Sequence, residues 1–289
     1  MTLASPATAL RRGGHDHIVD VLIAERAPKL AASVAWPVLR PLLYAMLGYG
    51  KARRMAEAIA PLTGRAALEH VSDLLALKVR TTGLDRVPAS GRLVVVCNHP
   101  TGIADGVAVF DALKAIRPEI CFYANADAHR VVPRFHDVLI PVEWVEAKRT
   151  RDKTRNTLVQ TREALEAERC LMIFPAGRLA RREADGVLRD PEWMSSAVSL
   201  ARRYDAPVLP MHVTGPYSAM FHFFNGVSEE LRDITLFHEL LNKHGRAFDL
   251  TAGPLIAAEA LDGDPVEMSA RLKAYVEQAL PSDPDRAFA

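Results

Sequence analysis

The sequence contains little cysteine and almost no net charge. Three Cys occur in 289 residues, all inside apolar runs, so no disulfide framework is indicated and a reducing compartment is expected. The 36 Lys and Arg nearly balance the 35 Asp and Glu, which excludes a bulk nucleic-acid binder. Internal repeats and low-complexity tracts are also absent. With 49% apolar and 25% charged residues, the composition is typical of a folded soluble protein.

Long apolar runs are scarce as well. Residues 1–20 lack the apolar core of a secretory signal peptide, so no such signal is expected. The stretch 33–50 is interrupted by Pro37, Arg40 and Pro41 and is shorter than a membrane span, which excludes a polytopic membrane protein. It predicts a kinked helix that either lies at a membrane interface or packs on the main domain. A second apolar patch, expected at the bilayer, in an acyl tunnel or in a core corner, comprises Phe221, Phe223 and Phe224.

The chain does contain a clear division between helical and alternating patterns. Residues 1–75 are expected to form an N-terminal helical, membrane-associating segment, and residues 76–289 the main domain. In the main domain, short apolar runs alternate with helical stretches, which predicts an α/β fold with a mixed, mostly parallel sheet flanked by helices. The expected strands are 93–97, 120–124, 138–142, 171–174 and 207–213, and the expected helices are 105–116 and 153–169.

A polar turn directly after the first of these strands contains the strongest candidates for chemistry. His99 suits a general base near neutral pH, and Asp105 is the nearest carboxylate that could fix its tautomer. Gly102 and Gly106 would let the backbone fold so that the two side chains meet. Asp105 also stands near the start of the next helix, so a helix-capping role is the alternative explanation. Open α/β sheets place their sites at such strand ends.

Basic side chains gather around a second turn, which follows the fourth expected strand. Gly177 and Arg178 form this turn and Arg181 comes soon after, while Lys148 and Arg149 precede the helix that leads into the strand. Guanidinium groups bind phosphate oxygens in a bidentate manner, so this cluster is a candidate site for an anionic headgroup. A solvated basic helix face is the alternative.

These turns belong to a series of short blocks along the chain. The first block is VRTTGLDRVPASGRLVVVCNHPTGIADG, and the others are LIPV at 139–142, FPAGR at 174–178, APVLPMHV at 206–213 and DLTAGPLI at 249–256. In this order they resemble the glycerolipid acyltransferase family, which includes bacterial 1-acylglycerol-3-phosphate acyltransferase. The resemblance covers roughly residues 76–257.

Two departures from the family pattern indicate a divergent branch. Five residues, rather than the usual four, separate His99 from Asp105. Ala176 stands where the third block usually has Glu, and Arg178 directly follows the glycine of that block. In both features the chain is similar to the hemolysin-like and ornithine-lipid acyltransferases, which places the identity of the acceptor in question more than the reaction.

The resemblance implies an enzyme that transfers a fatty acyl group from acyl-CoA or acyl-carrier protein to a lyso-lipid, such as lysophosphatidic acid. His99 would deprotonate the acceptor with support from Asp105, and donors near Gly102 or Gly177 would stabilise the tetrahedral oxyanion. No metal and no redox cofactor is implied. The implied headgroup-binding residues are Arg178, Gly177, Arg181, Lys148 and Arg149.

The same resemblance sets expectations for partners and location. A lyso-lipid, an acyl-CoA or acyl-carrier protein and a membrane surface are the expected partners, and nucleic acid is not among them. The expected location is peripheral, on the cytoplasmic face of the membrane.

Several alternatives fit parts of the pattern. A thioesterase or other hydrolase would use the same His–Asp pair on water, and a catalytically silent membrane-binding protein would not use it. Cys97 lies close to the histidine, but its Val-rich run predicts a core residue rather than a thiol nucleophile. The spacing of Asp127, His129 and His136 matches no metal-binding motif.

Overall fold

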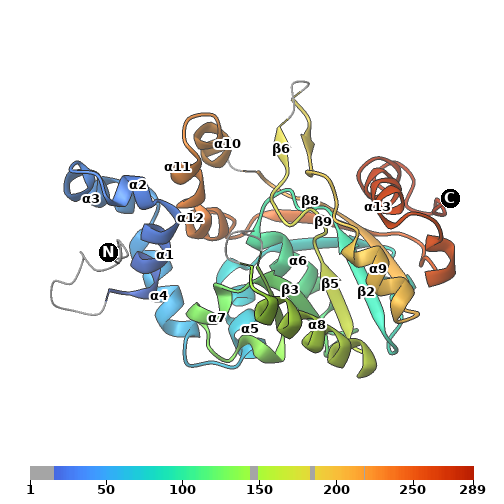
Figure 1. The fold of residues 1–289 in the computed structure, drawn as a ribbon. Coiled ribbons are helices and arrows are strands. Elements are labelled where there is room, and N and C mark those ends of the chain that lie inside the picture. The colour runs from blue at the N-terminus through green and yellow to red at the C-terminus, as the bar shows by residue number, and fades with distance from the viewer. Residues whose placement is uncertain (1–15, 144–148, 183–185, 218) are drawn as a thin grey trace, which may run out of the picture.

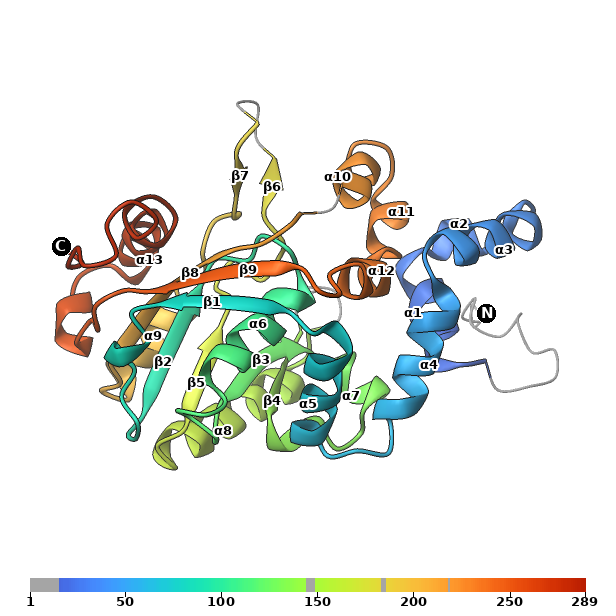
Figure 2. The same cartoon turned by 180° about the vertical axis from the view of Figure 1, so that it is seen from behind.

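The computed structural model describes residues 16–143, 149–182, 186–217 and 219–289. They form an α/β fold in which helices cover both faces of a central seven-stranded sheet, as Figures 1 and 2 show from opposite sides. The N-terminal helices lie at one end of the sheet and the C-terminal helix at the other. The fold class predicted from the sequence is confirmed.

The order of strands in the sheet is β1-β9-β8-β2-β5-β3-β4. Every neighbouring pair is parallel except β8 and β9, so the sheet is mixed and mostly parallel as expected. A short antiparallel hairpin, β6–β7, projects from the body of the molecule (Figure 2). The strands are β1 (Lys78–Thr82), β2 (Leu93–Cys97), β3 (Cys121–Asn125), β4 (Leu139–Val142), β5 (Cys170–Ile173), β6 (Arg181–Arg182), β7 (Leu188–Arg189), β8 (Val208–Thr214) and β9 (Ala247–Ala252).

The described helices fall into an N-terminal group and a group that covers or flanks the sheet. The first group is α1 (Ile18–Arg26), α2 (Pro28–Ala31), α3 (Trp36–Met46), α4 (Tyr49–Ile59) and α5 (Gly64–Leu75). The second group is α6 (Ile103–Leu113), α7 (Ala128–Val131), α8 (Arg151–Glu166), α9 (Ser196–Arg203), α10 (Ala219–Asn225), α11 (Glu229–Asp233), α12 (Leu236–Leu241) and α13 (Pro265–Ala274). A π-helical turn at Tyr275–Ala279 extends α13, and 3-10 turns lie at Leu84–Arg86, Phe135–Asp137 and Ala258–Leu261.

Both faces of the sheet are buried because its central strands are apolar throughout. All five residues of β2 are buried, and they alternate between the two faces as strand geometry requires. Leu93, Val95 and Cys97 pack in one cluster with α5 and α6. Val94 and Val96 pack in the other, with α8, α9 and α13. The rigid centre of the sheet therefore carries the turn that follows β2.

The N-terminal helices differ in how they relate to this core. The sequence left open whether they pack on the main domain or meet a membrane. Met55 and Ile59 of α4 and Val71 and Leu75 of α5 are buried in the same cluster as α6. By contrast, α3 has no buried residue. In the part of the chain that the structure describes, no helix has both the length and the apolar character needed to cross a membrane.

Candidate active site

The candidate groups from the two turns meet at one edge of the sheet. β2 is the parallel neighbour of both β5 and β8, so the carboxyl ends of these three strands lie side by side. His99 follows β2 and Phe174 follows β5. The structure therefore brings together the two turns that are 75 or so residues apart in the chain, at the position where open α/β sheets hold their sites.

Asn98 fixes the end of β2 to the neighbouring strand. Its side-chain oxygen accepts a hydrogen bond from the Val213 N–H at 2.7 Å, and its amide group donates to the Val213 carbonyl at 2.9 Å. Asn98 is buried. Through these two bonds, the Asn98 side chain extends the pairing between β2 and β8 beyond the end of β2. The residue that precedes His99 is therefore held in place.

His99 and Asp105 are in direct contact. The His99 Nδ1 atom lies 3.0 Å from Asp105 Oδ2, and the Asp105 side chain is fully buried while that of His99 is 16% exposed. A buried carboxylate acts as acceptor here, so Nδ1 carries the hydrogen and Nε2 keeps a lone pair. No described residue forms a hydrogen bond with Nε2. The imidazole is therefore arranged to take a proton from a bound molecule.

Asp105 holds the turn as well as the imidazole. Its carboxylate accepts from the Thr101 N–H at 2.8 Å, the Thr101 hydroxyl at 2.5 Å and the Gly102 N–H at 3.0 Å. Asp105 lies in the first turn of α6, where backbone N–H groups and the helix dipole favour a carboxylate. The same Asp105 side chain thus caps the helix and contacts His99, so the geometry accommodates both explanations offered by the sequence.

The second turn contacts both the ring and the main chain of His99. The Phe174 ring stacks on the His99 ring, with centroids 4.2 Å apart and planes inclined by 23°. The Ala180 N–H donates to the His99 carbonyl at 2.9 Å. Ala176, which stands where the resembled family usually has Glu, is buried and apolar. The FPAGR block therefore contacts the histidine directly.

Gly177 and Arg178 differ in what they offer to a ligand. Gly177 has a positive φ of 62°, and its N–H donates to the Phe174 carbonyl at 3.0 Å to close the turn. Arg178 is exposed, and no described residue forms an ion pair or hydrogen bond with its guanidinium. A cation without an internal partner beside the His99 turn suits an anionic ligand group.

The other basic residues predicted from the sequence are less closely placed. Arg181 is exposed on β6 of the projecting hairpin, a few residues beyond Arg178. Arg149 lies in the loop after β4, the edge strand, and its Nε donates to the Glu143 carbonyl at 3.0 Å. No described contact joins Arg149 to His99 or Arg178. Lys148 lies outside the described residues.

Both glycine N–H groups near which oxyanion donors were expected form hydrogen bonds within the turns. The Gly102 N–H donates to Asp105 and the Gly177 N–H donates to Phe174. Neither amide is therefore free, although the sequence placed the donors near these two glycines. Gly102 adopts a φ of 93° that favours glycine, and a Cβ there would lie 3.1 Å from the side chain of Leu179. Its role is to shape the turn.

Sequence reasoning did not find Asp190, which lies in contact with the main chain of His99. The His99 N–H donates to Asp190 Oδ1 at 3.0 Å and to Oδ2 at 3.2 Å. Asp190 is buried, and burial raises the pKa of its carboxyl to about 6. Asp190 follows β7 and belongs to none of the sequence blocks that resemble the family. In the sequence it is a lone carboxylate three residues before Trp193, which indicates no function.

The structure also bears on the alternative chemistries. Cys97 is fully buried, and burial raises the pKa of its thiol well above the ordinary value, so it is unsuited to act as a thiolate nucleophile. Asp127 forms an ion pair with Arg26 at 2.8 Å. Over residues 16–143, 149–182, 186–217 and 219–289, no group of three His, Cys, Asp or Glu side chains could hold a metal ion.

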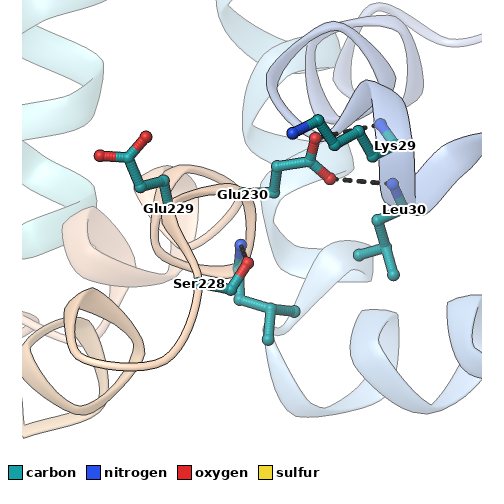
Figure 3. Close-up of a pocket in the computed structure, with 6 residues that line it drawn as sticks. Lys29, Leu30, Ser228, Glu229 and Glu230 are labelled. Carbon is teal, nitrogen blue, oxygen red and sulfur yellow. Dashed lines mark hydrogen bonds between the residues drawn. The ribbon is translucent and has the colours of Figure 1, made fainter.

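A pocket of about 550 Å³ lies away from this centre, between α2 and α11 (Figure 3). Its lining residues are Lys29, Leu30, Ser228, Glu229, Glu230 and Leu231. The Glu230 carboxylate accepts from the N–H groups of Lys29 and Leu30 at 3.0 and 2.8 Å. None of these residues belongs to the His99 centre. We interpret the pocket as the joint between the N-terminal helices and the α10–α12 segment.

Comparisons with known proteins point to one kind of enzyme. A family model described as acyltransferase matches residues 78–214, which include both turns. The lyso-glycine lipid O-acyltransferase of Phocaeicola vulgatus is 26% identical over 205 residues, covering 68% of this chain and 70% of that protein. The lyso-glycine lipid O-acyltransferase of Bacteroides thetaiotaomicron is 24% identical over 201 residues, covering 68% of this chain and 72% of that protein.

Among solved structures, the 1-acyl-sn-glycerophosphate acyltransferase PlsC of Thermotoga maritima is similar with a TM-score of 0.46 and 13% identity, over 93% of this chain and 98% of that chain. The resemblance seen in the sequence blocks is thus supported by the family model and by both curated relatives. With a matching acyltransferase family model and two lipid acyltransferases among its relatives, the chain is similar to the glycerolipid acyltransferases.

Proposed function

We propose that this acyltransferase moves a fatty acyl group from an acyl thioester to a hydroxyl group of a lyso-lipid. His99 is the general base and Asp105 orients it. The observation that carries the proposal is the 3.0 Å contact between His99 Nδ1 and the fully buried Asp105, which leaves Nε2 without a partner among the described residues. Acyl-CoA and acyl-carrier protein both present the required thioester.

The reaction requires only these groups for proton transfer. The hydroxyl oxygen of the acceptor attacks the thioester carbonyl carbon while His99 Nε2 takes its proton, and the imidazolium is stabilised by Asp105. The tetrahedral intermediate then collapses, the C–S bond breaks, and the leaving sulfur receives the proton from Nε2. An ester and a free thiol are the products, and His99 returns to its starting state. No acyl-enzyme is needed when both substrates are bound together.

The acceptor that we propose is a lyso-lipid with an amino-acid headgroup. Both curated relatives are named for lyso-glycine lipid, which carries an anionic carboxylate. The exposed guanidinium of Arg178 suits a carboxylate as well as a phosphate, and Arg181 lies on the adjacent hairpin. Ala176 is buried and apolar at the position where the resembled family usually has a carboxylate. Lysophosphatidic acid is the competing acceptor.

We further propose that the protein works at the cytoplasmic surface of a membrane, where its lipid acceptor resides. On α3, Val38 is 77% exposed and Leu42 is 68% exposed, one helical turn apart. On α10, Phe223 is 66% exposed. In Figures 1 and 2, α10 lies on the side of the sheet where α3 and the other N-terminal helices lie. Exposed apolar side chains on these two helices are what an interfacial contact with a membrane requires.

The test is an acceptor panel with labelled acyl-CoA and acyl-carrier protein as donors. Lyso-glycine lipid, lyso-ornithine lipid and lysophosphatidic acid are offered to the wild type and to Arg178→Ala. We expect ester formation to be fastest with an amino-acid headgroup, and Arg178→Ala to raise the acceptor KM. Release of free fatty acid without any ester would instead establish a thioesterase. Ester formation with lysophosphatidic acid alone would contradict the proposed acceptor.

A further inference from the structure

Asp190 is a buried carboxylate that the proposed reaction does not use, yet it lies against its central histidine. Both carboxylate oxygens accept from the His99 N–H, at 3.0 and 3.2 Å. Asp190 Oδ2 also accepts from the Trp193 Nε1–H at 2.9 Å, and Trp193 is itself buried. The carboxylate is therefore held in one orientation by two donors from different parts of the chain.

The main chain of Asp190 is held by a residue from the C-terminal helical segment. Its N–H donates to Glu277 Oε1 at 2.7 Å, and Glu277 Oε2 accepts from Lys273 Nζ at 2.6 Å. Glu277 lies in the π-helical turn Tyr275–Ala279 that extends α13. Such turns are frequent at functional sites. A continuous series of hydrogen bonds thus runs from Lys273 to the backbone of His99.

Three separate bonds then determine where the imidazole points. The His99 N–H is held by Asp190, its carbonyl by the Ala180 N–H at 2.9 Å, and its ring by Asp105 at 3.0 Å. Removing the first bond leaves the ring contact intact but frees the peptide unit before His99 to rotate. A displacement of Nε2 by a fraction of an ångström changes its alignment with the acceptor hydroxyl.

We propose that Asp190 is a positioning residue, which fixes the main chain of His99 and thereby aligns Nε2 with the acceptor hydroxyl. This inference deepens the proposed function and rests on it for the identity of the reaction. Asp190 acts through His99 and touches neither substrate. Glu277 and Trp193 hold Asp190 in the orientation that this task requires.

The electrostatic surroundings of Asp190 provide an independent readout. The titratable and charged groups that face it are His99 from the turn after β2, Cys97 at the end of β2, and Glu277 with Lys273 from the C-terminal helix. Burial raises the pKa of Asp190 to about 6, and the donors His99 N–H and Trp193 Nε1–H limit the rise. The Trp193 indole N–H should therefore report the protonation of Asp190.

The kinetic test compares Asp190→Asn with the matched control Glu192→Gln, which alters an exposed carboxylate two residues away. Asparagine offers one oxygen in place of two, so we expect kcat to fall on the order of 10- to 100-fold while the acceptor KM changes less than about twofold. The control should match the wild type. Trp193→Phe, which removes only the second donor, should lower kcat less than Asp190→Asn does. A folded Asp190→Asn enzyme with the wild-type kcat, or with only a raised KM, would overturn the inference.

The structural test does not depend on turnover. In the His99→Gln background, the ¹⁵N–¹H resonance of the Trp193 indole should shift with pH around a midpoint above the ordinary carboxyl pKa, and the further change Asp190→Asn should abolish that midpoint. Trp193→Phe identifies the resonance. An indole signal insensitive to Asp190 would overturn the inference even if the enzyme is active. Failure of the wild type with every acceptor, with the indole titration intact, would instead contradict the proposed function.

Discussion

At the scale of single residues, Asp105 joins the stability of the fold to the chemistry of the site. One carboxylate receives hydrogen bonds from Thr101, Gly102 and His99, and its side chain is fully buried. The sequence predicted both the pairing with His99 and a helix-capping role, because both follow from a carboxylate near a helix start. It did not predict Thr101 as a partner, since that contact depends on the exact path of the turn.

Because Asp105 both holds the turn and contacts His99, substitutions of Asp105 and His99 should differ in their effect on stability. Asp105→Ala leaves buried donors without an acceptor and should lower the free energy of unfolding by more than about 3 kcal/mol. His99→Ala removes a partly exposed ring and should cost only about 1 kcal/mol. Chemical denaturation of both variants measures the difference. Equal destabilisation by the two substitutions would contradict the assigned role of Asp105.

The same reasoning predicts the effect of Asp105→Asn on the reaction. The isosteric amide keeps the volume of the side chain but can no longer stabilise the imidazolium or select its tautomer. We expect kcat to fall by roughly 10²- to 10⁴-fold. The measurement is the rate of thiol release at saturating acceptor, and wild-type activity in Asp105→Asn would exclude His99 as a base that depends on this carboxylate.

Asp190 predicts a pH dependence of stability. Its pKa in the folded chain, about 6, exceeds the ordinary carboxyl value because the group is buried. The folded state therefore holds this proton more tightly, and the associated stability is present at low pH and lost as the pH rises through 6. Relative to Asp190→Asn, the wild type should lose about 1.4 kcal/mol of unfolding free energy between pH 5 and pH 8. Denaturation curves of both proteins at several pH values measure this, and a constant difference would contradict the raised pKa.

Asp190 also shows why part of the site could not be read from the sequence. The contact joins residues 91 positions apart, and its acceptor meets a main-chain N–H of His99 rather than a side chain. A hydrogen bond to a main-chain N–H does not require a particular residue type at that position, so the sequence pattern does not predict it. His99, Asp105 and the FPAGR block could be predicted because they follow buried strands, and the parallel order of these strands brings them to one edge.

At the scale of elements, the strands that sequence reasoning found each contain consecutive buried apolar residues. The expected strand 93–97 matches β2, and 138–142, 171–174 and 207–213 match β4, β5 and β8 within one residue at each end. β1 was not predicted, since four of its five residues are exposed and its sequence KVRTT contains no apolar alternation. The exposed, polar side chains of β1 leave no apolar periodicity, which is the signal on which the prediction depends.

The turn between β2 and α6 depends on a glycine. At Gly102 the backbone has a φ of 93° and a Cβ would approach Leu179, whereas Gly91 has a φ of 85° with open space around it. Both alanine variants should be destabilised by about 1–3 kcal/mol through backbone strain. Only Gly102→Ala should also lower kcat, because it displaces the N–H that Asp105 accepts. Thermal unfolding and thiol release test this, and equal kcat values for the two variants would contradict it.

The exposed helix α3 predicts how the protein meets a membrane. Val38→Asp combined with Leu42→Asp should weaken binding to anionic lipid vesicles at least about tenfold, because two apolar side chains no longer enter the interface. Leu158→Asp on α8 changes a side chain that is 52% exposed and serves as the control. Cosedimentation with vesicles measures binding. Equal loss in the double variant and the control would contradict a specific role for α3.

At the scale of the whole molecule, helices on both sides of the predicted division at residue 75 share one core cluster. The division itself stays a prediction, yet α4 and α5 bury Met55, Ile59, Val71 and Leu75 in the main core. Each such side chain contributes roughly 1.5–3 kcal/mol, which together rivals the total stability of a typical domain. A shortened chain of residues 76–289 should therefore lack a cooperative unfolding transition by circular dichroism. A cooperative transition in that chain would show that the helices are dispensable for folding.

The central claim concerns acyl transfer by His99 without an acyl-enzyme, and one measurement tests it most directly. Thiol release and ester formation are followed together, from one labelled acyl thioester and a lyso-lipid with an amino-acid headgroup, for the wild type and His99→Gln. We predict one ester for each thiol in the wild type, no thiol release without acceptor, and loss of both products in the variant. Equal ester formation by His99→Gln, or thiol release that does not require the acceptor, would contradict the account.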